Sequence, residues 1–485
     1  IVLFENQLFL TVSFEFRVVP DDVHSARRLL DDADILSTLE RCFKVIHDTS
    51  RTPSLGEVPA KNTVPGSRTS ARVTVINNLA RFLKRNIFDV VKLRQTRLDH
   101  NLFDIIWPAM KKSHQMRLVD DDADAGVVIP DFDCYVVFRE FLVPLIKDIH
   151  CLDISQNLKP HPTSNFFPSG LESIPVEGKT EEPPLETEAL KEIHLNLDPA
   201  GKWIKSTLVE CCRNLEVFEL PLTLSVAQLE HVERILTGRL LSKDFSEAIG
   251  EETLGQYYSM NEVLENPSEI RTMLSAYGLL IPLLNTNDAC QLSESMARNG
   301  QYWPYGRGVY VSHTNDFVVW INCHEHMRIL CCTQSETVAD IGVAFSKVGR
   351  AVQFLDEIIS FRNTYYLGNL TSRPSYLGTG LRLSYIISLP HLMKESDNLR
   401  QLCATRSLLM SRPRSHLLQS SMVRLSNKQS LGLTEWRIFI DFCTAAANIL
   451  QLEKDLSLTN TKHIATMFVN IFRKKKHSLA EVTNN

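Results

Sequence analysis

Residues of the kind that perform chemistry follow an apolar run near position 320. Residues 317–321 are apolar and rich in β-branched side chains, which predicts a strand buried on both faces. The sequence N-C-H-E-H-M-R follows at 322–328, so carboxylate, imidazole, thiol and guanidinium groups come from one strand end. Binding and catalytic residues are commonly delivered in this way by a rigid scaffold. The whole stretch 299–333 is expected to form a loop, a strand, a tight turn, a second strand and a short polar crossing.

Two kinds of site can be considered for this polar stretch. His324 and His326 could act as an acid/base pair, or they could be partly buried side chains that are hydrogen-bonded in the core. Cys323, His324, Glu325 and His326 are the one group with residue types suited to zinc. On a strand these side chains would alternate between the two faces, so we expect no metal site.

Composition limits the class of protein. A chain of 485 residues exceeds one ordinary core, so we expect two domains plus extensions. The net charge of −5 argues against a general binder of nucleic acid or of anionic membranes. The sequence contains no run of 18 uncharged apolar residues, so we expect no transmembrane helix. It does not begin with Met or with a positively charged and then apolar leader, so we expect the chain to be processed or to begin inside a longer product. Eleven irregularly spaced cysteines predict reduced thiols in an intracellular compartment, either cytoplasmic or cytoskeletal, or mitochondrial.

Periodicity predicts the elements that would position the site. Strands are expected at 203–209 and 381–389, and helices at 101–107, 135–148, 224–241, 338–359 and 434–456. Ser225 and Thr434 are suited to begin two of these helices, and Pro108 could end or kink the first. Strands and helices in uneven order favour an α+β fold. The acidic run 120–122 is interpreted as a solvated loop, with a cation site as the alternative.

Five segments are predicted along the chain. Residues 1–70 form an N-terminal extension, in which 1–20 alternate weakly like an added strand or docking segment and 23–47 have a helical period. Residues 71–158 form a small helical domain, and the Pro- and Glu-rich residues 159–190 form a linker. Residues 191–460 form the larger domain and 461–485 a basic tail.

Several motifs resemble one known family in order and spacing. They are Y-W-P-Y-G-R-G at 302–308, the strand that ends in N-C-H-E-H-M-R, L-G-T-G-L-R at 377–382, S-N-K at 426–428 followed by L-G-L-T-E at 431–435, and G-V-V-I-P-D at 126–131. Together they resemble the phosphagen kinases, the ATP:guanidino phosphotransferases that include arginine and creatine kinases. The resemblance implies a small all-α N-terminal domain and a larger domain with a mostly antiparallel β-sheet flanked by helices, as in glutamine synthetase-like folds.

The resemblance also implies which positions would carry out the reaction. Arginines that match the family's phosphate ligands are present at Arg328, Arg382 and Arg412, whereas Leu208 and Glu210 stand where two more are expected. Three cationic positions thus remain of five, and Glu210 adds a negative charge. These arginines could bind nucleotide phosphates, or they could pair with acidic neighbours that include Glu210.

The positions that would bind the acceptor also depart from the family's pattern. His324 and Leu417 stand where the resemblance places carboxylates for a guanidinium group, and Arg373 replaces the reactive cysteine. Arg373 could be structural or could restore positive charge. A cationic His324 would repel a guanidinium, and a neutral one substitutes poorly for an anion.

These departures led us to predict a catalytically degenerate homologue, a pseudoenzyme that serves as a structural or docking subunit of a larger assembly. Protein partners would bind through residues 1–70, and the resemblance implies a homodimer. Two alternatives stay open, an active guanidino phosphotransferase with an altered acceptor and a nucleotide-binding sensor. No cofactor is expected, with residual Mg-ATP or Mg-ADP binding as the alternative, and no nucleic-acid partner is expected.

Overall fold

The computed structural model describes residues 2–4, 7–9, 82–110, 127–167, 193–265, 267–281, 300–333, 339–411 and 421–457. The chain divides into two units, residues 1–94 and 95–485, each compact on its own. The first unit contains the antiparallel strands β1 (Val2–Phe4) and β2 (Gln7–Phe9), within the predicted strand-like stretch, and helix α4 (Arg85–Val91). The helix predicted at 23–47 and the acidic run at 120–122 lie outside the described residues.

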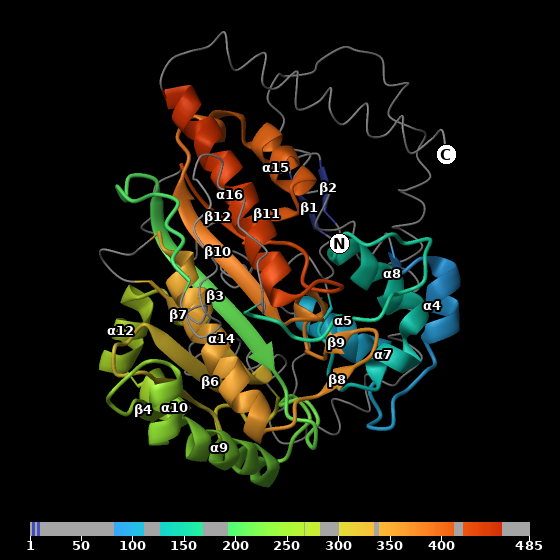
Figure 1. Cartoon of the computed structure of the whole chain (residues 1–485). Helices are drawn as coiled ribbons and strands as arrows, with labels where there is room; N and C mark the ends of the chain where they lie inside the picture. Colours follow the sequence, from blue (N-terminus) through green and yellow to red (C-terminus); the bar gives the residue numbers. More distant parts are fainter. Residues whose placement is uncertain are drawn as a thin grey trace, which may run out of the picture. The chain divides into compact units, whose positions relative to one another are not determined.

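The second unit contains the larger set of helices, numbered as in Figure 1. They are α5 (Leu102–Met110), α7 (Cys134–Val137), α8 (Arg139–Ile149), α9 (Val226–Leu240), α10 (Lys243–Ala248), α11 (Met260–Leu264), α12 (Glu269–Ala276), α14 (Ile341–Ile358), α15 (Ser396–Thr405) and α16 (Glu435–Ser457), with the short 3-10 helices η4 (Pro374–Tyr376) and η5 (Leu392–Glu395). In the part of the chain that is described, no helix is long and apolar enough to cross a membrane.

An antiparallel sheet of eight strands is the centre of this unit. Its order is β11 (Leu408–Ser411), β12 (Met422–Asn427), β10 (Leu381–Ser388), β3 (Ile204–Arg213), β7 (Glu325–Cys332), β6 (Phe317–Cys323), β5 (Gly308–Val311) and β4 (Gln256–Ser259). A separate hairpin joins β8 (Asn363–Thr364) and β9 (Gly368–Asn369). The predicted fold class, a small helical domain and a larger domain with a mostly antiparallel sheet flanked by helices, is confirmed.

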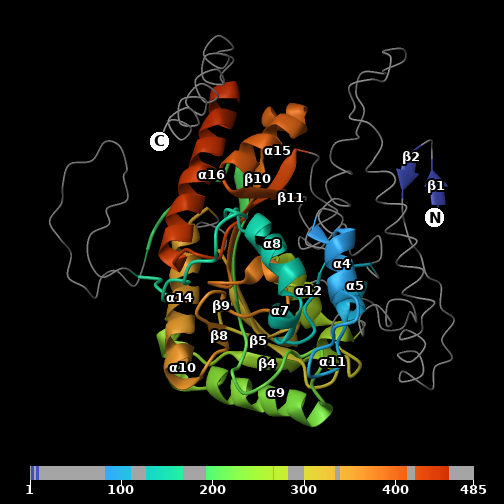
Figure 2. The same cartoon turned by 90° about the vertical axis from the view of Figure 1, so that its right-hand side faces the viewer.

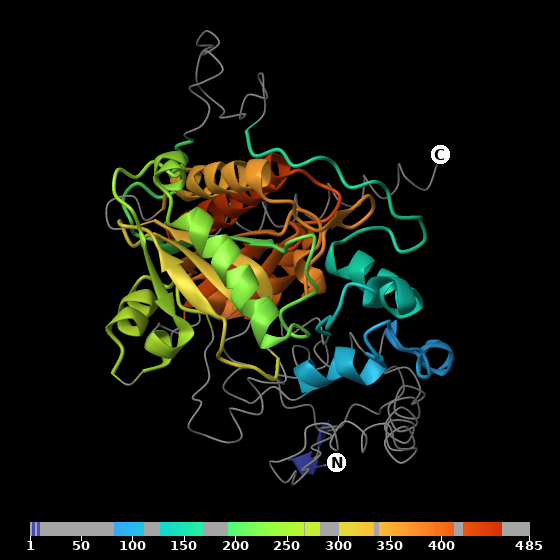
Figure 3. The same cartoon turned by 90° about the horizontal axis from the view of Figure 1, so that it is seen from below.

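The apolar face of the sheet packs against α9, α14 and α16. Alternate residues of the central strands, such as Val209, Ile329 and Leu383, belong to one core together with apolar residues of these helices. The rings of Phe345 in α14 and Phe439 in α16 stack with their centroids 4.4 Å apart. Figure 2 shows α14 and α16 along one side of the sheet and α7 and α8 on the other, and Figure 3 gives the view along the sheet from below. On the second face, strands β5, β6 and β7 share another apolar cluster with α11 and α12, and polar side chains occupy the part of that face beside it.

Capping explains where two of the predicted helices begin. Ser225 starts α9 with a capping box in which Gln228 donates its backbone N–H to the serine oxygen. Asp340 starts α14, since its Oδ1 accepts from the backbone of Gly342 over 3.1 Å. The helices predicted at 224–241, 338–359 and 434–456 are all present with bounds that differ by at most three residues.

Two local predictions need correction. The helix expected at 135–148 is two helices, α7 and α8, because Phe138 leaves the helical region with φ −107° and ψ 27°. The polar crossing expected after the second strand of 299–333 is itself mostly strand β7, next to β3. The polar side chains of this strand do not follow the apolar pattern expected of a buried strand. Their partners, among them Asn214 and Ser372, come from distant segments of the chain.

Candidate functional site

The second face of the central sheet carries charged residues. Glu210 of β3 lies directly opposite Arg382 of β10, and Arg328 of β7 lies opposite Cys212 of β3. Since cross-strand partners point to the same side, these four side chains share one face. Glu210, Arg328 and Arg382 are 0%, 2% and 3% exposed, so their charges must be neutralised within the protein.

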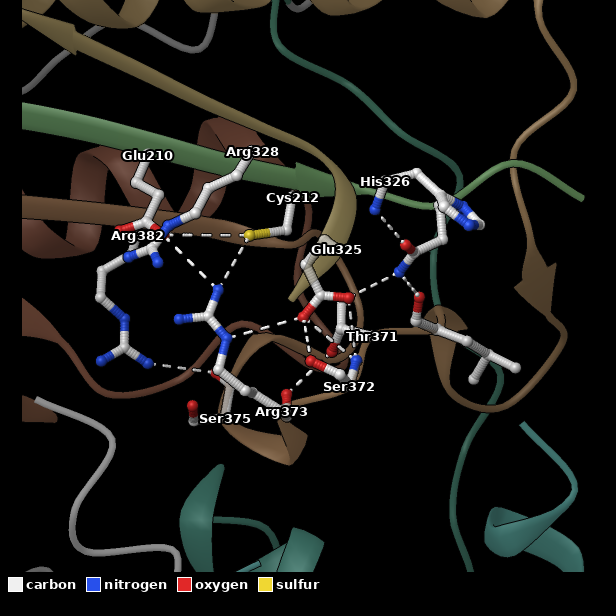
Figure 4. A network of polar contacts seen from close by, with 12 residues as sticks. Glu210, Cys212, Glu325, His326, Arg328, Thr371, Ser372, Arg373, Ser375 and Arg382 are labelled. Atoms are coloured by element: carbon white, nitrogen blue, oxygen red, sulfur yellow. Dashed lines mark hydrogen bonds and ion pairs between the residues drawn. The ribbon is translucent and has the colours of Figure 1, made fainter. Parts of the chain in front are cut away.

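Glu210 is a shared anion for two arginines. Arg328 Nε donates to Glu210 Oε1 over 2.5 Å, and Arg373 Nη2 lies 3.6 Å from the same oxygen (Figure 4). Burial lowers the pKa of Arg328, but the Glu210 carboxylate and other nearby acidic groups together raise it, and the net shift of the pKa is upward. Pairing with Glu210, one of the two arrangements considered for Arg328, is the arrangement present here. The negative charge that seemed misplaced in the sequence thus has two cationic neighbours.

Tyr376 holds two guanidinium groups beside this anion. The Cζ atoms of Arg373 and Arg382 lie 4.0 and 4.4 Å from the centroid of its ring, within cation–π range. Arg382 Nη2 also donates to the carbonyl oxygen of Ser375 over 3.3 Å. The short helix η4, which carries Ser375 and Tyr376, therefore places both arginines against the polar face.

Glu325 ties the loop before η4 to the sheet. Its carboxylate accepts from Ser372 Oγ over 2.6 Å, from Ser372 N over 2.9 Å and from Asn214 Nδ2 over 2.7 Å. Arg373 Nε lies 3.5 Å from Glu325 Oε1. This carboxylate is completely buried. Its position is fixed by donors on Asn214 and Ser372, which are distant in the sequence but adjacent in the fold.

The two histidines of the polar stretch have different surroundings. His326 is fully buried, and its Nδ1 accepts from the backbone N–H of Leu215 over 3.0 Å, which places the ring proton on Nε2. Burial lowers its pKa to about 3, so it is neutral at physiological pH. His324 is half-buried and forms the single-residue connection between β6 and β7 with φ +68°. The two histidines therefore occupy different environments, His326 in the buried strand and His324 in the turn before it.

Arg424 is a further cation on the same face. It lies on β12, is 3% exposed and donates from Nη2 to Ser384 Oγ over 3.1 Å. Ser384 lies directly opposite Leu208, and its hydroxyl donates to the Leu208 carbonyl oxygen over 3.3 Å. Arg424 therefore brings positive charge to the region where Leu208 supplies none. Arg424 was not among the positions predicted from the sequence, although it lies two residues before Ser426 and therefore on the same side of a strand.

Arg412 and Leu417 lie outside the described residues. Trp320 is fully buried and Trp303 nearly so, as expected of core aromatics. Across the described ranges, no three His, Cys, Asp or Glu side chains lie close enough to hold a metal ion.

Models of one known family match two parts of this chain. Residues 75–147 match the N-terminal domain model of the ATP:guanido phosphotransferases, and residues 238–456 match their C-terminal catalytic domain model. The chain belongs to the ATP:guanido phosphotransferase family. The phosphagen kinase resemblance of its motifs is thereby confirmed.

Individual relatives of this phosphotransferase homologue are kinases. It is 26% identical to an arginine kinase of Penaeus monodon over 384 residues, 78% of this chain and 93% of the relative, and equally similar over 385 residues to the arginine kinase Pro c 2.0101 of Procambarus clarkii. Its fold is similar to that of a duplicated taurocyamine kinase from Schistosoma mansoni, with a TM-score of 0.59 and 23% identity over 81% of this chain. The alignment spans 49% of that duplicated protein. A lombricine kinase structure aligns with a TM-score of 0.56 and 18% identity, over 78% of this chain and 92% of its own.

The comparisons correct one prediction from the sequence. We predicted a pseudoenzyme, and this is wrong, because the catalytic-domain model matches and the relatives found are arginine kinases. The prediction weighed the lost arginines at 208 and 210 one position at a time. It took no account of Arg424, and it counted Glu210 as an added negative charge although pairing with the arginines had been considered. The predicted docking through residues 1–70 stays a prediction.

Proposed function

We propose that this phosphotransferase homologue transfers the γ-phosphoryl group of ATP to a guanidino acceptor that differs from the acceptor of arginine kinases. The observation that carries the proposal is the set of three buried arginines, Arg328, Arg382 and Arg424, on one face of the central sheet. They come from strands β7, β10 and β12, so a rigid scaffold sets their positions.

Phosphoryl transfer depends mainly on positioning and on neutralising charge that develops on the phosphate oxygens. Arginine is suited to this because its planar fork matches two phosphate oxygens at once. Tyr376 and Ser375 hold Arg382, and Ser384 holds one nitrogen of Arg424, before any substrate binds. Donors fixed in advance stabilise a transition state without a cost of reorganisation.

A change of acceptor is inferred from the residues that match the family's guanidinium carboxylates. His324 stands at one such position, and a half-buried imidazole cannot supply the negative charge of a carboxylate. Among the described residues, Glu210 and Glu325 are carboxylates that lie beside Arg373. The carboxylates that bind an acceptor would thus lie at positions other than those in arginine kinases, which favours a guanidino compound of a different shape from arginine.

An acceptor screen tests the proposal. ADP release is measured with Mg-ATP and a panel of guanidino compounds, for wild type, Arg382→Ala and the control Arg437→Ala. Arg437 is exposed on α16 and pairs with Asp441, so its loss should leave the rate unchanged. One acceptor should raise ADP release above the background, and Arg382→Ala should reduce that rate by about 10²–10³-fold.

The same screen has a clear contrary result. If wild type binds Mg-ADP in a calorimetric titration but releases ADP at the background rate with every acceptor, the transferase proposal fails and nucleotide sensing replaces it. If Arg382→Ala and Arg437→Ala have equal acceptor-dependent rates, the arginine face does not carry the reaction.

A further inference from the structure

The guanidinium group of Arg373 is surrounded as a bound ligand would be. Its Nη2 lies 3.6 Å from Glu210 Oε1 and 3.3 Å from Cys212 Sγ, and its Nε lies 3.5 Å from Glu325 Oε1. The ring of Tyr376 lies 4.0 Å from its Cζ. The residue is 6% exposed, and Figure 4 shows it between the two carboxylates. Two anions and an aromatic face are the groups that recognise a planar cation.

The two carboxylates are held in place by residues other than Arg373. Arg328 binds Glu210, while Ser372 and Asn214 donate three hydrogen bonds to Glu325. Both anions therefore keep a partner if the side chain of Arg373 moves away. The groups that recognise the guanidinium thus do not depend on that guanidinium for their own positions.

The backbone around Arg373 is anchored as well. The hydroxyl of Tyr135 donates to Thr371 O over 2.8 Å, and His150 Nε2 lies 2.9 Å from Pro374 O. Burial lowers the pKa of His150 to about 4, so the neutral ring donates this hydrogen bond. Because the backbone is anchored at Thr371 and at Pro374, we expect Arg373 to withdraw by rotation of its side chain.

We propose that Glu210, Glu325 and Tyr376 form a guanidinium-binding site that Arg373 occupies as a tethered competitor. A free guanidino compound enters when the Arg373 side chain rotates out, and rebinding of the arginine displaces it. A group tethered by its own chain has an effective concentration in the millimolar range, so the free compound binds weakly while Arg373 is present. That this compound is the phosphoryl acceptor rests on the proposed function. That it binds at this site in competition with Arg373 does not depend on the proposed function.

Removal of the tethered group provides the test. Methylguanidinium is titrated into the full chain of wild type, Arg373→Ala and the control Arg437→Ala, and binding is followed by calorimetry and by the shift in unfolding temperature. Arg373→Ala should bind at least ten times more tightly than wild type and should gain thermal stability with added ligand, whereas Arg437→Ala should match wild type. Methylammonium, which has a charge but no planar fork, should bind the Arg373→Ala variant at least ten times more weakly than methylguanidinium.

Further variants keep the result decisive. Arg373→Gln retains the length of the side chain and removes its charge, so it replaces Arg373→Ala if the latter does not fold. Adding Glu210→Gln to either variant should abolish the gain in affinity. Equal binding by wild type and by a folded Arg373 variant overturns the proposal. If the variant binds methylguanidinium but wild type shows no acceptor-dependent ADP release, the guanidinium site stands and only the transferase function fails.

Discussion

Loss of the Glu210 charge should destabilise the protein far more than loss of an exposed carboxylate. In Glu210→Gln the buried cations of Arg328 and Arg373, 2.5 and 3.6 Å from the carboxylate oxygen, lose their shared anion. Removing one partner of a buried pair typically costs about 3–5 kcal/mol, because the other charge is left in a medium of low dielectric. Arg373 keeps Glu325, so Arg328 is expected to account for most of this cost.

The assay is urea unfolding followed by circular dichroism at pH 7, for wild type, Glu210→Gln and the control Glu247→Gln. Glu247 pairs with Lys243 at a separation of 3.1 Å on the surface of α10, with both side chains more than half exposed. Exposed pairs of this kind contribute about 0–1 kcal/mol, so the control should unfold close to wild type. The slope of the free energy of unfolding with urea should be equal in all three proteins.

Phosphate provides an independent arm of the same experiment. Inorganic phosphate can replace the missing carboxylate beside Arg328, so it should stabilise Glu210→Gln more than wild type. A ligand present at 100 times its dissociation constant contributes about 2.7 kcal/mol, which is large enough to measure. The reasoning is refuted if Glu210→Gln lies within 1 kcal/mol of Glu247→Gln, a threshold at the upper end of the range for exposed pairs.

Three further predictions follow from individual residues. Arg424→Ala should weaken Mg-ADP binding by about tenfold or more in calorimetry, because a charge-assisted hydrogen bond contributes roughly 1.5–3 kcal/mol; unchanged affinity would remove Arg424 from the site. His150 has a folded pKa of about 4, below the usual value near 6.5, so the unfolded chain binds more protons there, and the contribution of this residue to stability should fall by about 1.4 kcal/mol per pH unit as pH decreases from about 6.5 toward 4. His150→Gln should reduce that slope in urea titrations, and an equal slope would contradict the assignment. Gly378→Ala should destabilise by about 2–4 kcal/mol, since φ is +91° and a Cβ would collide with the carbonyl oxygen of Ser430, whereas Gly238→Ala, with open space in α9, should be neutral or stabilising. Equal effects of the two glycine substitutions on thermal unfolding would argue against the constraint at 378.

Local patterns were sufficient for the elements whose causes are local. The alternation at 381–389 and the helical period at 338–359 identify β10 and α14, because burial of one side of a strand or helix is recorded in residue order. Ser225 marks the start of α9 because its side chain accepts a hydrogen bond from a backbone N–H only three residues later. The spaced motifs extended this to the fold class, which the sheet order and the family models confirm.

The polar strand β7 was beyond local pattern. Its residues Glu325 and Arg328 were predicted to lie in a short polar crossing, since charged side chains are rarely buried without partners. Those partners, Asn214, Ser372 and Glu210, are 47 to 118 positions away along the chain. The pairing of β3 with β7 in the sheet explains why a strand with these charged residues can be buried.

Residue periodicity was enough to predict the main helices, and the resemblance of the spaced motifs to a known family implied the antiparallel sheet. The meaning of each charge on the polar face depended on the folded arrangement. Glu210 looks in the sequence like an obstacle to phosphate binding, and in the fold it is the partner of Arg328. Arg424 has no distinguishing feature in the sequence, and in the fold it is hydrogen-bonded to Ser384 on the same face as Arg382. Electrostatic energy depends on distance in space, and residue order does not record the distance between β3, β7 and β12.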